Sequence, residues 1–209
     1  MSVAMFSKNK IRSCRQRGAT LIEALVSILV LSLGLLGMAG LQLNALSFQK
    51  SSWAQHRVSE LTTDIVERMQ TNPFASQRGQ YNYTQTYAIS AAANLSSAGC
   101  QTATFPCTAQ QIAGDDLSSW MKKAQQTLPG GAASISGNAT QGFVVTAMYL
   151  DKDFRDAVTN AASTSTSCTA ALTGNAWRNC CPPSANVPSG IRCTRTPFFV
   201  YVASNLAAN

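Results

Sequence analysis

The chain of 209 residues is long enough for one ordinary domain and an additional segment. Sixteen basic and nine acidic residues give a formal net charge of +7, a value compatible with nucleic acid or anionic lipid as a partner. Five of the basic residues precede Ala19, however, and the rest of the chain has a net charge of only +2. This near balance argues against an extended nucleic-acid surface on the main part of the protein.

A long uncharged segment follows the basic N-terminus and covers residues 24–49. As a helix, residues 24–43 would measure about 30 Å, the thickness of the hydrocarbon core of a bilayer. The basic residues in front of it predict a cytoplasmic N-terminus and an exported main part. A secretory signal usually has a shorter apolar core, of roughly 7–15 residues, although cleavage near Ala39 is an alternative. Cys14 precedes the apolar run, which argues against a lipoprotein signal.

Glu23 places a carboxylate at the start of this apolar segment. A charge at the centre of a membrane helix costs about 3 kcal/mol, and less near an end. Cleavage between Gly18 and Ala19 would create an amine about one helical turn from Glu23, or beside the Glu23 of a neighbouring chain. Because an amine and a carboxylate attract strongly at low dielectric, we expect Glu23 to bind the N-terminus of another subunit.

A basic leader that ends in Gly18, followed by an apolar helix with glutamate at its fifth position, resembles the class III signal of type IV pilins and type II secretion pseudopilins. The resemblance implies that a prepilin peptidase cleaves after Gly18 and methylates Ala19, and that Glu23 acts in subunit assembly. Most members of the family have phenylalanine where this sequence has Ala19.

The helical pattern continues beyond residue 49 as a narrower apolar stripe. Apolar side chains recur at spacings of three and four, at Ala54, Val58, Leu61, Ile65 and Met69. Asp64 and Arg68 form an i,i+4 pair, and Pro73 disfavours further helix. We therefore expect one helix over about residues 19–71, roughly 80 Å long.

The chain after this helix predicts a small α+β head. Residues 74–113 are predicted to form a long connection, and Asp115 and Asp116 to cap a short helix that ends near Thr127. Strands are predicted at 143–150 and 197–203, with a short one at 134–136. The prolines and glycine of CCPPSANVPSGIRC predict irregular structure before the last strand.

An even number of cysteines in an exported head predicts disulfides. The six candidates are Cys100, Cys107, Cys168, Cys180, Cys181 and Cys193. Cys100–Cys107 is the favoured pair because only six residues separate the two cysteines, and a bond within Cys180-Cys181 is disfavoured by geometry. The other connectivities stay open. A zinc site is the rival interpretation, although no C-x-x-C pair occurs and His56 lies far away in the helix.

The sequence shows no catalytic arrangement and no cofactor motif. A nucleophile generally requires a nearby base, and the only histidine, His56, lies in the predicted helix. Asp151 and Asp153 could hold a cation at the end of a strand, but a solvated strand end is the simpler interpretation. We expect a protein that is not an enzyme.

The order of elements resembles the type IV pilin fold: a long helix, a variable connection, antiparallel strands and a cysteine-tied C-terminal region. The segments ELTTDIVERMQTNP and WMKKAQQTLPGG resemble PilV-type minor pilins. The resemblance implies a leader at residues 1–18, a helix at 19–72 with a membrane-spanning half at about 24–43, and a head at 73–209. It also implies a location in the inner membrane, with the N-terminus cytoplasmic and the head periplasmic, and later in the extracellular pilus.

The implied function is that of a minor pilin that supports pilus assembly, twitching and adhesion. Its partners would be major and minor pilins, the prepilin peptidase, the inner-membrane assembly platform and, before assembly, the lipid bilayer. One alternative is a type II secretion pseudopilin. Another is a pilus-borne receptor for DNA or a surface, although nucleic acid is disfavoured by the charge balance. The candidate contacts for that receptor are Lys122, Lys123, Arg178, Arg192 and Arg195.

Overall fold

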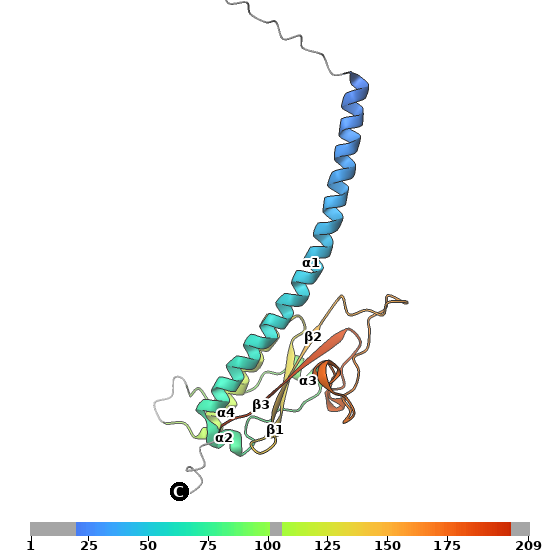
Figure 1. Ribbon diagram of the computed structural model, residues 1–209. Helices are drawn as coiled ribbons and strands as arrows, with labels where there is room; N and C mark the ends of the chain where they lie inside the picture. Colours follow the sequence, from blue (N-terminus) through green and yellow to red (C-terminus); the bar gives the residue numbers. More distant parts are fainter. Residues whose placement is uncertain (1–19, 101–105, 202–209) are drawn as a thin grey trace, which may run out of the picture. The chain divides into compact units, whose positions relative to one another are not determined.

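The computed structural model describes residues 20–100 and 106–201 (Figure 1). The chain divides into two units, residues 1–46 and residues 47–209, and the boundary falls within the first helix. The helices are α1 (Leu21–Thr71), α2 (Pro73–Gln77), α3 (Tyr87–Ala91), α4 (Ala109–Thr127) and α5 (Gly174–Arg178), with a 3-10 turn η1 (Pro183–Ala185). The strands are β1 (Ala132–Asn138), β2 (Gly142–Leu150) and β3 (Ile191–Phe198). The predicted division at residues 18 and 72, the first from processing and the second from the end of the long helix, stays a prediction.

The long helix predicted from the sequence is present as α1, which begins at Leu21 and ends at Thr71. Its part in the first unit, Leu21–Leu46, is long and apolar enough to cross a membrane, with a mean hydropathy of 2.3. Every side chain of this part is exposed in the isolated chain. In the second unit, the predicted apolar stripe of α1 is buried, from Ala54 to Met69.

The head contains one antiparallel sheet in which β2 lies between β1 and β3 (Figure 1). In the register, Thr146 of β2 is paired with Ser134 on one side and Arg195 on the other. The core combines the second part of α1, α4 and the sheet. Trp120 of α4 is almost fully buried, and its indole N–H donates a hydrogen bond of 2.8 Å to the carbonyl oxygen of Leu61.

The prediction of the last strand is wrong in position. β3 runs over Ile191–Phe198, so it begins inside the segment predicted to be irregular and ends before most of the predicted 197–203 strand. Pairing with β2 selects this position, because Cys193 lies opposite Met148 in a buried cluster. Gly190, with a φ of +85°, supports the turn that precedes the strand. Strand β2 lies where it was predicted, and β1 is longer than the predicted 134–136.

The helix predicted to start at Asp115 begins earlier, and this prediction is also wrong. Helix α4 starts at Ala109, and Thr108 caps it in a reciprocal capping box with Gln111. Asp115 and Asp116 therefore lie inside the helix. The connection predicted over residues 74–113 also contains regular structure, because Pro73 opens α2 and the side chain of Thr86 caps α3.

Candidate functional site

The first candidate site is the exposed apolar part of α1 with Glu23 in its first turn. A carboxylate in the first turn of a helix is favoured by the partial positive charge of that end. Gly18 and Ala19, the predicted processing residues, lie outside the described residues. At Gly34, Gly37 and Gly40, an added Cβ atom would meet nothing within 4 Å. The described part of the chain therefore covers none of these three positions, and close packing against another helix is sterically open there.

A group of charged side chains joins the second part of α1 to α4. Asp64 accepts hydrogen bonds from Arg68 at 2.9 Å and from Lys123 at 3.0 Å. Arg68 also donates to Asp116 at 3.0 Å, and the hydroxyl of Tyr81 donates to the other oxygen of Asp116 at 2.6 Å. The predicted pair of Asp64 and Arg68 is thus present and belongs to a larger network.

The contacts in this network shift the pKa values of Asp64 and Tyr81. Burial works to raise the pKa of Asp64, but the hydrogen bonds from Arg68 and Lys123 outweigh it, so the pKa is lowered. Burial raises the pKa of Tyr81, and the hydrogen bond to Asp116 raises it further. At neutral pH, Asp64 is therefore a carboxylate and Tyr81 a neutral phenol. The network fixes α4 on the second part of α1.

The six cysteines of the head are paired in the structure as Cys100–Cys107, Cys168–Cys180 and Cys181–Cys193. The first pair is the one that the sequence favoured, and the other two answer the connectivity that it left open. No group of three or more potential metal-ligating side chains occurs in the part of the chain that the structure describes. Asp151, one of the two candidate cation ligands, pairs instead with Arg192 at 3.2 Å.

Asp115 holds the chain at the start of the first disulfide loop. Its carboxylate accepts hydrogen bonds from the backbone N–H groups of Cys100, at 2.6 Å, and Ala98, and from the hydroxyl of Ser97 at 2.9 Å. Burial works to raise the pKa of Asp115, but these hydrogen bonds outweigh it and the pKa is lowered. Asp115 thus serves the loop rather than the helix cap for which it was predicted.

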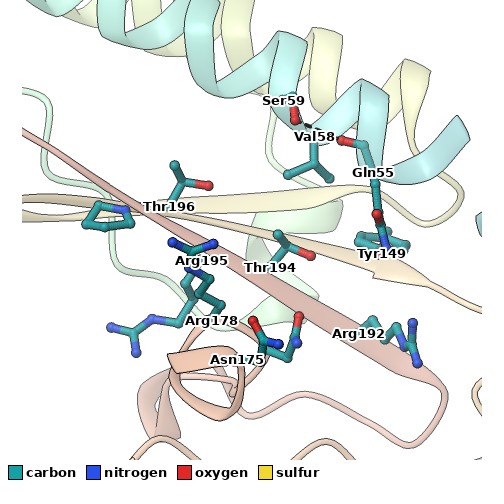
Figure 2. A pocket seen from close by; sticks show the side chains of 12 residues that line it. Gln55, Val58, Ser59, Tyr149, Asn175, Arg178, Arg192, Thr194, Arg195 and Thr196 are labelled. Atoms are coloured by element: carbon teal, nitrogen blue, oxygen red, sulfur yellow. Dashed lines mark hydrogen bonds between the residues drawn. The ribbon is translucent and has the colours of Figure 1, made fainter. Parts of the chain in front are cut away.

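The five candidate cations of the receptor hypothesis are divided between two places. Lys122 and Lys123 lie on α4, and Lys123 is paired with Asp64. Arg178, Arg192 and Arg195 line one cavity of about 430 Å³, bordered by α1, α5 and β3 (Figure 2). The structure therefore brings the three arginines together, but it does not join them with the lysines in one basic surface.

The sequence reasoning missed the polar residues that complete this cavity. They are Gln55 and Ser59 of α1, Asn175 of α5 and the following Asn179, and Thr194 and Thr196 of β3. Figure 2 shows Thr194 and Thr196 on the side of β3 that faces Gln55 and Ser59. The available signal was the spacing of Arg192, Thr194 and Thr196, because alternate residues of a strand line one face; Arg195 lies on the other face and reaches the cavity around the edge of the sheet.

In a comparison with known families, residues 13–39 match the prokaryotic N-terminal methylation motif. The matched segment includes Gly18, Ala19 and Glu23. No curated protein and no solved structure matches the chain.

Proposed function

We propose that this chain, which joins the prokaryotic N-terminal methylation motif to a type IV pilin fold, is a minor pilin that supports assembly of a type IV pilus. The motif and the fold support a type IV pilin or pseudopilin. The observation that carries the proposal is an apolar helix, Leu21–Leu46, whose side chains are all exposed in the isolated chain and whose first turn holds Glu23. Such a surface requires lipid or other apolar helices around it.

The proposed assembly step moves this helix from the bilayer into a bundle of pilin helices. In the membrane, the head would stay periplasmic because the basic leader keeps the N-terminus cytoplasmic. In the fibre, Glu23 would bind the N-terminal amine of a neighbouring subunit, and the two charges would offset the desolvation of each other. The main partners are therefore other major and minor pilins. The motif also suggests a structural rather than an enzymatic protein.

The preference for a minor pilin over a pseudopilin rests on the two segments that resemble PilV-type proteins. In the structure these segments contact each other, since Trp120 donates to the carbonyl oxygen of Leu61 and Lys123 pairs with Asp64. Their joint occurrence thus has a physical reason: each supplies one side of the same helix–helix contact.

The N-terminus of the mature protein is the first test. Mass spectrometry of protein from membrane and pilus fractions should find a chain that begins at N-methylated Ala19. A chain that begins at Leu41, after cleavage as an ordinary secretory signal, would contradict the proposal.

The second test is Glu23→Ala in cells that assemble pili. We expect normal insertion into the membrane, because the substitution removes a charge from an apolar helix, and strongly reduced incorporation into sheared pili. Glu67→Ala is the matched control, since Glu67 is an exposed acid of the same helix within the head unit. Equal incorporation of both variants would show that the carboxylate has no docking role.

The third test separates the pilus from the secretion system. Deletion of the gene should reduce the number of surface pili and twitching motility, while secretion of type II substrates should continue. The reverse result, with normal piliation and impaired secretion, would identify a pseudopilin. Normal pili that fail to attach to a surface would favour the receptor alternative.

A further inference from the structure

The cavity lined by Arg178, Arg192 and Arg195, here called the arginine cavity, contains cations without matching acids. No aspartate or glutamate is among its lining residues. Arg192 reaches Asp151 outside the cavity, at 3.2 Å. Neither Arg178 nor Arg195 has an ion pair within the described chain. The cavity therefore has a surplus of positive charge in a concave surface, where low-dielectric walls strengthen the attraction for an anion.

Arg195 is held in place by contacts that do not neutralise the positive charge of its guanidinium group. Its guanidinium carbon lies 4.2 Å from the centre of the Trp177 ring, and its Nη1 lies 3.3 Å from the sulfur of both Cys168 and Cys180. Its Nε–H is buried and has no hydrogen-bond partner. The contacts with Trp177 and the disulfide fix the position of this side chain, and its buried Nε donor leaves it incompletely satisfied.

The remaining polar groups of the cavity are neutral hydrogen-bonding groups. Carboxamides come from Gln55, Asn175 and Asn179, and hydroxyls from Ser59, Tyr149, Thr194 and Thr196. Amides and hydroxyls both donate and accept, which matches the hydroxyl groups of a sugar, whereas a bare anion needs donors alone. The volume of about 430 Å³ is within the range of sites for small molecules.

We infer that the arginine cavity binds an acidic sugar, a uronic acid residue whose carboxylate contacts Arg178 and Arg195 while its hydroxyls contact the neighbouring neutral polar groups of the cavity. Arginine presents a planar fork that fits a carboxylate with two parallel hydrogen bonds. The site is a binding site of the head, and it requires neither the docking role of Glu23 nor assembly of the chain into a fibre.

The test is titration of the purified full chain, in detergent micelles, with galacturonic acid. Galactose has the same ring without the carboxylate, and inorganic phosphate is an anion without a sugar ring. We expect saturable calorimetric binding of galacturonic acid, with galactose and phosphate each bound at least roughly tenfold more weakly. Equal binding of galactose would overturn the role of the arginines, and equal binding of phosphate would overturn the sugar. Lack of saturable binding of galacturonic acid would overturn the whole inference.

Two variants locate the site. Arg178→Gln should weaken binding of galacturonic acid roughly tenfold or more, the loss expected for one charge-assisted interaction. Lys122→Gln removes the same charge from an exposed position outside the cavity and should leave the affinity unchanged. Arg195→Lys keeps the charge but removes the fork, so it should also weaken binding while thermal unfolding shows a folded head. Equal loss in the Lys122 and Arg178 variants would show attraction to net charge rather than a site.

Discussion

The two parts of α1 have similar local structure but bury their side chains in opposite ways. In Leu21–Leu46, apolar residues occupy all sides of the helix and every side chain is exposed in the isolated chain. From Ala54 to Met69, apolar residues form one stripe, which is buried against α4 and the sheet, and the other side is polar. The stripe matches an environment with water on one side, whereas a helix that is apolar all round requires an apolar environment on every side.

This difference shows that the head unit is complete in itself while the first part of α1 is not. The second part finds its core partners within the same chain, so its contribution should appear in the stability of the folded head. The first part finds none among the described residues, so its contribution should appear only in a membrane or an assembly. The predictions below test this division by unfolding the full chain in detergent micelles, in order of decreasing effect.

The largest expected effect is that of Trp120→Ala. The substitution removes a side chain that is only 1% exposed and leaves the carbonyl oxygen of Leu61 without its donor. We expect the free energy of unfolding of the head to fall by about 4 kcal/mol in urea titrations. Trp53→Ala is the matched control, since Trp53 is 46% exposed and its loss should change little. Similar losses for both tryptophans would contradict the proposed boundary of the core.

A direct comparison of the two parts of α1 uses one truncation in each. Ile65 is fully buried, and Ile65→Ala should lower the free energy of unfolding by about 3 kcal/mol. Leu33 is 62% exposed, and Leu33→Ala should leave the unfolding of the head unchanged. If Leu33→Ala destabilised the head, the first part of the helix would contribute to its core, and the division would fail.

The charged network between α1 and α4 predicts a dependence on pH. The pKa of Asp64 is lowered in the folded chain, so its stabilisation is fully present above the ordinary value of 3.8 and is lost as the pH falls through the lower folded value. Asp64→Asn should cost about 1–2 kcal/mol at pH 7 and should flatten the loss of stability below pH 4. Urea titrations at pH 7 and pH 3 measure both. If the free energy of unfolding of the variant fell between pH 7 and pH 3 as much as that of the unchanged protein, other carboxylates would dominate acid unfolding.

The smallest predicted effect concerns the start of α4, which covers the buried stripe of α1. Thr108→Ala removes the side chain that accepts from the backbone N–H of Gln111 and should cost about 1 kcal/mol. Thr108→Ser keeps the cap and should be nearly neutral. Circular dichroism during urea unfolding measures the difference, and equal losses in both variants would exclude the cap as the cause.

The sequence predicted the elements whose signals are local. The stripe of α1 and its end near Pro73 follow from spacing and from the chemistry of proline, and β2 follows from its β-branched and aromatic residues. The start of α4 was missed because Asp115 and Asp116 are good caps by residue type, whereas Thr108 and Gln111 act as a pair. Local preference could not place β3, since its position depends on pairing with β2 and on the bond between Cys193 and Cys181.

The two candidate sites show the same limit, because only features with a local signal can be found in the sequence. Glu23 could be selected from the sequence because a carboxylate at the edge of an apolar run is unusual by itself. The arginine cavity could not, because Gln55, Asn175 and Arg195 come from three elements far apart in the chain. The receptor hypothesis named all three arginines but grouped them with Lys122 and Lys123, since charge alone carries no information about which surfaces meet.

The adjacent residues Cys180 and Cys181 belong to two different disulfides, and this has a consequence for how the protein matures. Cys180 closes a loop back to Cys168, and Cys181 closes a loop of equal length forward to Cys193. Exchanging the two neighbours would give bridges only one residue longer, so loop entropy barely distinguishes the native isomer from the exchanged one. The correct disulfide pairing must therefore be directed by the register of β3, which sets Cys193 opposite Met148 and beside Cys181 in one buried cluster. Oxidation before the sheet forms would therefore yield a mixture of isomers, and thiol–disulfide exchange would be needed to recover a uniform protein.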